Sequence, residues 1–208
     1  MSGTLKSYYD EFYATDPMRF GTMPLGIVRV ALEEQILSPK SHVLVIGGGQ
    51  GRNTFPFARK GHAVSVIDIS SVAVEQMNKE AQRNGLSLYA RQGDIFAEGI
   101  AGIYDMIVCA FLLHFYPRAQ SGGLLREIKE HTAFDGFNAI AAFTTKGDFY
   151  REAAGRDLCY FLPGELGMLY AYWNHIIPPL EQWGGAVDTR ADGKPKWNLS
   201  VHILARKP

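Results

Sequence analysis

The residues whose types and spacing favour chemistry in this chain are a glycine-rich loop and two aspartates. Each aspartate follows a later apolar run. The loop, Gly47-Gly48-Gly49-Gln50-Gly51, directly follows the apolar run Val43 to Ile46. Glycines let a ligand approach the backbone closely and allow the positive φ angles of a tight turn between a strand and a helix. Asp68 follows a second apolar run, 21 positions after Gly47, where its carboxylate can accept hydrogen bonds from both hydroxyls of a ribose. Together these features favour a nucleoside-binding site.

Asp94, in the segment QGDIF, follows a third apolar run and extends the same pattern. Its carboxylate can receive the amino group of an adenine, while the backbone of Ile95 can meet a ring nitrogen and Ile69 or Ile95 can cover a face of the base. Two plainer interpretations stay open, because Asp68 can cap the next helix and Asp94 can be an ordinary turn residue.

The sequence of the loop also favours one class of nucleotide-binding site over another. A dinucleotide-binding GxGxxG fingerprint that starts at Gly47 requires a glycine at position 52, which is Arg52, so the loop matches GxGxG better. The spacing of Gly47 and Asp68 still leaves an NAD(P)-dependent oxidoreductase as an alternative.

Composition and charge argue against several other classes of function and structure. Lys plus Arg and Asp plus Glu both number 21, so the formal net charge is zero and no global field draws the protein to nucleic acid or anionic lipid. Cys109 and Cys159 lack CxxC or Cys/His spacing, which argues against a disulfide framework or a metal site and favours a reducing, cytoplasmic setting. The longest apolar stretch, Met106 to Tyr116, is interrupted by His114, and the first residues lack the apolar core of a signal peptide, so we expect no membrane span.

The elements that must position these residues alternate between strand and helix. Four-residue spacing with Pro, Ser and Gly punctuation predicts helices over 25–37, 70–84 and 124–132, and a further helix after the glycine loop. Short apolar runs predict strands over 43–46, 62–67, 86–92, 104–110 and 139–144. Such alternation implies a doubly wound α/β fold with a mostly parallel sheet and helices on both faces.

The last third of the chain has a different pattern. We expect a helix in the segment GELGMLYAYWN and then two strand-like runs over 176–189 and 197–205, joined by the turn-forming ADGKP. These runs predict an antiparallel pair at the edge of the sheet, which brings it to seven strands. A length of 208 residues suits a single domain.

Four segments resemble the core of the class I S-adenosylmethionine-dependent methyltransferases: VLVIGGGQGRNT, VSVIDIS, QGDIF and YDMIVCAFLLHF. The resemblance implies a Rossmann-like domain over 1–208, with N-terminal cap helices in 1–40, a cofactor-binding core in 41–145 and a substrate side in 146–208. It implies S-adenosylmethionine as cofactor and S-adenosylhomocysteine as its product. The implied cofactor contacts are Gly47, Gly48, Gly49, Gly51, Arg52, Asp68, Ile69, Asp94, Ile95 and Ala110.

Both flanks of this core extend the resemblance. The segment YYDEFYATDPMRFGTMPLGIV is similar to the cap of small methyltransferases that closes over the methionine end of the cofactor, which implies that Phe20 lies there and that Arg19 reaches the cofactor carboxylate. The segments LPGELGMLYAYW and DTRADGKPKWNLSVHILARK look like the last third of the tellurite-resistance type.

The chain departs from these families at Val45, at Gly48, where a cysteine is common, and at the pair Val187-Asp188. Val45 stands where an acid usually binds the cofactor ammonium, so backbone carbonyls near Gly47 and Ala110 have to satisfy that group. Val187-Asp188 stands where the tellurite-resistance relatives carry a His-Arg pair, so their substrate does not carry over to this chain.

Candidates for the chemistry itself lie beyond the fourth and fifth strands. A sulfonium methyl is already electrophilic, so orientation of the acceptor is the main requirement and no metal or triad is obligatory. His114 and Tyr116 are the candidate acid/base or substrate contacts, and Tyr150 and Arg151 are candidate substrate contacts. Packing and a solvated loop are the plainer interpretations of these residues.

An aromatic cluster in the first twenty residues, with Tyr9 and Tyr13 as candidate substrate contacts, can form a lid. Packing of an N-terminal helix on the core is the plainer interpretation. The leading hypothesis is a cytoplasmic methyltransferase, a monomer or homodimer, that acts on a small molecule and not on nucleic acid. The alternatives are an NAD(P)-dependent oxidoreductase and a non-catalytic S-adenosylmethionine-binding module, the latter suggested by Val45 and Gly48.

Overall fold

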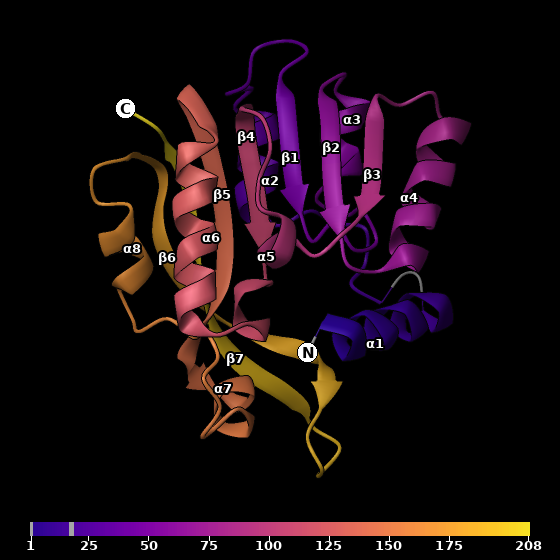
Figure 1. The fold of residues 1–208 in the computed structure, drawn as a ribbon. Coiled ribbons are helices and arrows are strands. Elements are labelled where there is room, and N and C mark those ends of the chain that lie inside the picture. Colours follow the sequence, from indigo (N-terminus) through magenta and orange to yellow (C-terminus); the bar gives the residue numbers. More distant parts are fainter. Residues whose placement is uncertain (1, 17–18) are drawn as a thin grey trace.

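A computed structural model describes residues 2–16 and 19–208 of the chain (Figure 1). The helices are α1 (Ser2–Thr15), α2 (Gly26–Glu33), α3 (Phe55–Arg59), α4 (Ser71–Arg83), α5 (Ile95–Glu98), α6 (Arg118–Glu130), α7 (Asp148–Glu152) and α8 (Glu165–Leu169), with a 3-10 turn η1 (Leu113–Phe115). The strands are β1 (His42–Ile46), β2 (Ala63–Asp68), β3 (Leu88–Gln92), β4 (Tyr104–Ala110), β5 (Thr132–Gly147), β6 (Asn174–Thr189) and β7 (Pro195–Arg206).

The strands form one seven-stranded sheet in the order β3-β2-β1-β4-β5-β7-β6. The pairs from β3 to β5 are parallel, whereas β7 runs antiparallel to β5 and β6 runs antiparallel to β7. The predicted α/β fold with a terminal antiparallel pair is therefore confirmed. The strand order reverses between β1 and β4, and in doubly wound sheets the carboxyl edge at such a point is where ligands bind.

Helices cover both faces of the sheet, because strand residues alternate between two apolar clusters. Ile46 and Ile107 face the cluster that includes Ile128 of α6. Val45 and Val108 face the opposite cluster, which receives α2, α3 and α4. Figure 1 shows α6 in front of the sheet and α2 behind it.

Several predicted boundaries need correction. The helix expected over 25–37 ends at Glu33, since Gln35 has a left-handed φ of 50°. The helix expected over 124–132 begins at Arg118, and Thr132 already belongs to β5. Its extra first turn is anchored by the buried Ser121, whose hydroxyl donates to the Leu113 carbonyl at 2.9 Å.

The segment GELGMLYAYWN is helical only over Glu165–Leu169, and Asn174 starts β6. The chain turns at Tyr170, a fully buried side chain whose hydroxyl donates to Asn138 Oδ1 at 3.0 Å. The terminal strands also start earlier than predicted, and β5 is longer in both directions than the expected 139–144.

The carboxyl ends of the parallel strands lie at one edge of the sheet, the lower edge in Figure 1. α1, α7 and the far half of the β6–β7 hairpin lie below this edge. Among the described residues, no helix is long and apolar enough to cross a bilayer.

Candidate active site

A cavity of about 700 Å³ lies at the carboxyl edge, a volume typical of small-molecule sites. Its wall includes most of the predicted site residues: Tyr9, Tyr13, Phe20, Gly47, Gly48, Gly49, Arg52, Asp68, Ile69, Asp94, Ile95, Ala110, His114 and Tyr116. Arg19, Gly51, Tyr150 and Arg151 are not part of this wall. The cavity extends from the β1–β3 ends, past β4 and β5, to the β6–β7 hairpin.

Asp68 is the buried carboxylate of the β1–β3 side. Its Oδ2 accepts from the backbone N–H of Gly49 at 2.7 Å, and its Oδ1 accepts from that of Ser70 at 2.9 Å. Burial raises the pKa of Asp68, although these two backbone donors oppose the shift. The cap of α4 is Ser70, whose hydroxyl accepts from Ala73 N, so Asp68 is not the cap residue. Each carboxylate oxygen retains acceptor capacity for a ligand.

The glycine loop has a tight geometry that side chains do not fit. Gly49 has a left-handed φ of 52°, and a Cβ atom there would lie 2.7 Å from the Tyr13 hydroxyl oxygen. A Cβ atom on Gly48 would lie 2.4 Å from Val66 Cγ1 in the core. The loop therefore provides a bare backbone at the switch point of the sheet.

Asp94 caps a helix in this structure, and its contact with the adenine of a ligand stays a prediction. Its carboxylate caps α5 by accepting from Phe96 N at 3.1 Å, and it also accepts from the Tyr116 hydroxyl at 3.0 Å. Tyr116 stacks on Phe96 with ring centroids 3.6 Å apart. Burial and the Asp94 carboxylate both raise the pKa of Tyr116, so it stays a protonated donor at neutral pH.

α1 covers the β1–β3 side of the cavity with aromatic rings. Tyr9 stacks on Tyr13 with centroids 5.6 Å apart and packs edge-on against Phe115 beyond β4. Asp10 holds the helix to the loop after β2, because its Oδ1 accepts from the Ser70 hydroxyl at 2.7 Å. Burial raises the pKa values of Tyr9 and Tyr13, which therefore remain uncharged.

The segment after α1 crosses the glycine loop. Phe20 N donates to Gln50 Oε1 at 3.0 Å, and Arg52 Nη1 donates to the Phe20 carbonyl at 3.2 Å. Arg19 pairs instead with Asp188 of the β6–β7 hairpin, Nη2 to Oδ1 at 3.2 Å. Pro17 and Met18, and the side chain of Val187, lie outside the described part of the chain.

His114 lies in η1 and is only 9% exposed. Its ring centroid lies 4.0 Å from that of Phe115, 4.8 Å from Phe143 and 6.0 Å from Tyr160. Burial lowers its pKa to about 3, and Nδ1 has no hydrogen-bond partner among the described residues. A neutral imidazole is therefore available at the cavity wall.

Tyr150 and Arg151 of α7 do not line the cavity, although Tyr150 packs against Tyr160, which does. Arg151 donates to Asp148 Oδ1 at 2.6 Å and is well exposed, while Tyr150 packs edge-on against Tyr160. Asp148 Oδ2 also accepts from Trp197 N at 2.7 Å. This cluster secures α7 to β7.

Polar residues of the β6–β7 hairpin line the cavity and were not predicted. They are Gln182, Lys196, Asn198, Ser200 and His202. The segment NLSVHIL carries the signal that could have revealed them: polar and apolar residues alternate along a strand whose polar side chains are also buried.

Cys109, Val45 and His62 do not line the cavity. Cys109 is fully buried in β4, and burial raises its thiol pKa to about 12. Val45 is buried in the core, and His62 lies at the opposite edge of the sheet from the cavity. The described residues contain no cluster of three His, Cys, Asp or Glu side chains that could hold a metal ion.

Sequence comparisons match the chain to methyltransferases. Residues 43–136 match the model of the methyltransferase domain family. The probable S-adenosyl-L-methionine-dependent methyltransferase TehB of Haemophilus influenzae is 31% identical over 114 residues, which are 55% of this chain and 40% of TehB. The ribosomal protein L11 methyltransferase of an Exiguobacterium strain is 30% identical over 114 residues, 50% of this chain and 36% of that protein. The chain thus spans about two fifths of the length of these relatives.

Solved structures agree on the fold. The crystal structure of Haemophilus influenzae TehB has a TM-score of 0.77 at 25% identity, and the match covers 96% of this chain and 67% of TehB. Magnesium protoporphyrin IX methyltransferase from Synechocystis, solved with bound S-adenosylhomocysteine, has a TM-score of 0.67 at 15% identity, with all of both chains covered. The latter match shows the shared Rossmann-like fold alone.

Proposed function

We propose that this chain, which carries a methyltransferase domain over residues 43–136, transfers a methyl group from S-adenosylmethionine to a small molecule. The observation that carries the proposal is one cavity whose wall includes both the Asp68 carboxylate beside a bare glycine loop and an uncharged imidazole beyond β4. The first feature suits the nucleoside of the cofactor, and the second suits an acceptor.

The residues of the β1–β3 side fit this cofactor. Asp68 can accept from the ribose hydroxyls through the lone pairs that Gly49 and Ser70 leave free. Asp94 and the backbone of Ile95 can bind the adenine edge, and Ala110 lies in the sheet beside the glycine loop. When bound, the cofactor supplies an electrophilic methyl group on a positively charged sulfur.

The chain's own contribution to the reaction is orientation and exclusion of water. Tyr9, Tyr13 and Phe115 close the wall around the point where the two sides of the cavity meet. The acceptor forms the new bond to the methyl carbon as the carbon–sulfur bond breaks with its electron pair left on sulfur. The neutral imidazole of His114 can accept a hydrogen bond from the acceptor and so orient it, whereas the proton that the acceptor releases passes to solvent, because a pKa of about 3 keeps the imidazole from holding it at pH 7.

The proposal assigns 1–40 to the cap, 41–145 to cofactor binding and 146–208 to the acceptor side. Zero formal net charge supports a small molecule rather than nucleic acid as substrate. The free, buried Cys109 and Cys159 favour a reducing compartment, so we also place the reaction in the cytoplasm.

Thermal unfolding with S-adenosylhomocysteine, NAD or NADP tests the cofactor assignment. A ligand at about 100 times its dissociation constant adds roughly 2.7 kcal/mol, which raises the Tm of a chain of this size by about 5–11 °C. We expect this rise with S-adenosylhomocysteine alone. A rise with NAD or NADP and none with S-adenosylhomocysteine would favour the oxidoreductase and overturn the proposal.

A further inference from the structure

β7 presents a buried polar face to the cavity. Asn198 is 3% exposed, Ser200 6% and His202 4%, and all three line the cavity. The residues between them, such as Val201, belong to the apolar core on the other side of the sheet. Since buried polar side chains are costly unless they are paired, a whole polar strand face at a cavity points to a ligand.

The sheet register places this face beside the end of β4. His202 pairs with Ala141 of β5, and Ala141 pairs with Ala110, the last residue of β4. Two strand spacings, about 10 Å, therefore separate the backbone of His202 from that of Ala110. Only the methyl group of Ala141 stands between them in that row. The polar face thus lies on the far side of β4 from Asp68 and the glycine loop.

Hydrogen-bonding capacity on this face is left unused by the described residues. Asn198 Oδ1 accepts from Phe149 N at 2.8 Å, which fixes the orientation of the amide, and its buried Nδ2 has no partner. His202 Nε2 contacts the Ser200 hydroxyl at 2.9 Å and Gln182 Nε2 at 3.4 Å, whereas Nδ1 makes no hydrogen bond to the described residues. A ligand that satisfies the Asn198 amide and the second imidazole nitrogen completes the site.

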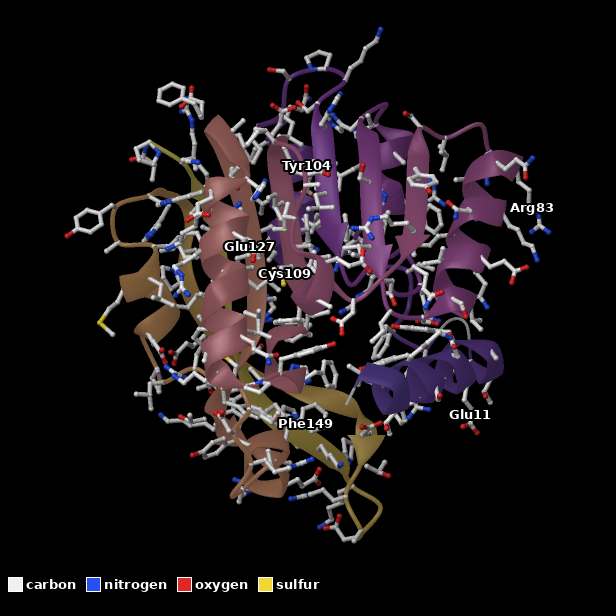
Figure 2. All side chains as sticks on the ribbon, in the orientation of Figure 1. Glu11, Arg83, Tyr104, Cys109, Glu127 and Phe149 are labelled. Atoms are coloured by element: carbon white, nitrogen blue, oxygen red, sulfur yellow. The ribbon has the colours of Figure 1, made fainter. Side chains whose placement is uncertain are left out.

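Aromatic rings form the walls around these polar atoms. Phe111 has a left-handed φ of 54°, a strained conformation for a side chain of this size. Its ring lies 4.8 Å from Phe143 and 5.6 Å from His202, and Phe149 packs edge-on against Phe143 at 5.0 Å. Figure 2 labels Phe149 below the sheet, over the β7 hairpin. The strained backbone at Phe111 thus places an aromatic ring against the polar face of β7.

The three polar side chains of this β7 face are uncharged at pH 7. Burial lowers the pKa of His202 to about 4, with the Arg52 cation adding to the shift, so both His202 and His114 are neutral at pH 7. Lys196 is paired with Glu152 at 2.7 Å, and Asp188 with Arg19. Two cations of the cavity wall, Arg52 and Arg156, have no carboxylate partner among the described residues and donate to the backbone carbonyls of Phe20 and Glu152.

We infer that Asn198, Ser200 and His202, walled by Phe111, Phe143 and Phe149, form the acceptor subsite and select an uncharged aromatic molecule that bears a hydroxyl. This inference rests on the proposed methyltransferase function. The unpaired amide and imidazole nitrogens bind the polar group, and the three rings pack against the aromatic plane. None of these six residues is a cation, so an anion forms no ion pair within the subsite itself.

The test measures binding of 2-naphthol and 2-naphthoate to the protein saturated with S-adenosylhomocysteine, by titration calorimetry at pH 7. The two probes share a ring system and differ in charge, and selenite serves as an anion without a ring. His202→Leu removes the imidazole, and Asn198→Asp keeps the acceptor for Phe149 N while removing the unpaired donor. His62→Leu is the matched control, because His62 is also buried with an unpartnered Nδ1 but does not line the cavity.

We expect 2-naphthol to bind more tightly than 2-naphthoate or selenite. His202→Leu and Asn198→Asp should each weaken 2-naphthol binding about tenfold, the loss of one net hydrogen bond, while His62→Leu leaves it unchanged. Binding of 2-naphthol no tighter than that of 2-naphthoate or selenite, or an equal loss in the His62 control, would overturn the inference. Failure of S-adenosylhomocysteine to bind the wild-type protein would instead refute the proposed function, so the two failures are distinguishable.

Discussion

Replacing Asp68 with asparagine separates the charge of this side chain from its shape. If both carboxylate oxygens accept from ribose hydroxyls, each charge-assisted hydrogen bond contributes roughly 1.5–3 kcal/mol. An asparagine keeps one acceptor oxygen, so the affinity for S-adenosylhomocysteine should fall about 10- to 150-fold. The amide NH2 also faces the backbone N–H of Gly49 or Ser70, and this N–H then has no acceptor on that side-chain atom. That unpaired donor lowers the free energy of unfolding by about 1–3 kcal/mol, and removal of a buried charge partly offsets this loss of stability.

Titration calorimetry measures the affinity, and urea unfolding of each apo variant measures the stability. Asp148→Asn is the matched control, because Asp148 is equally buried and accepts from the backbone N–H of Trp197 but lies outside the cavity wall. That control should lose stability while its affinity for S-adenosylhomocysteine stays within about twofold of wild type. An Asp68→Asn variant with wild-type affinity, or an Asp148→Asn variant with the same loss of affinity, would refute the ribose assignment.

Three further predictions follow from the geometry. Gly49→Ala should destabilise the protein by about 1–3 kcal/mol in urea unfolding, because the position has a φ of 52° and the new Cβ atom would lie too close to the Tyr13 hydroxyl. The double variant Gly49→Ala/Tyr13→Phe should recover part of that stability, and no recovery would argue against the contact. His114 has a folded-state pKa of about 3, below the unfolded value near 6.5, so the unfolded state takes up the proton first and about 2 kcal/mol of stability is lost from pH 7 to pH 5. His114→Phe should flatten the pH dependence of Tm by that amount, and an unchanged slope contradicts the burial argument. Arg19→Ala and Asp188→Ala should each cost less than about 1 kcal/mol, because both side chains of the pair are partly exposed to solvent; a larger loss in denaturant unfolding would show that the pair is structural.

The parallel core was predictable because strands buried on both faces have nearly continuous apolar sequences. Val43 to Ile46 and Tyr104 to Ala110 illustrate this, since both became central strands with little change of bounds. The first turns of α6 were missed because they are polar and contain Gly122-Gly123, and only the tertiary bond from Ser121 to Leu113 shows why they are helical.

The candidate site likewise includes residues that local sequence patterns reveal and residues that only the tertiary structure brings together. The glycine loop and Asp68 follow directly from strand ends, and the structure brings them within hydrogen-bond distance. Arg19 pairs with Asp188, which lies 169 positions away, so no local pattern could identify this partner, and its contact with the cofactor carboxylate stays a prediction. His202 was missed although NLSVHIL alternates, because only the register with Ala141 places that face at the cavity.

A crystal structure with S-adenosylhomocysteine would test the central claim most directly. The account predicts both ribose hydroxyls within hydrogen-bond distance of the Asp68 carboxylate, the adenine edge at Asp94 and Ile95, and the sulfur directed across Ala110 toward His114. A nucleoside bound elsewhere, or a ribose that makes no contact with Asp68, would contradict it.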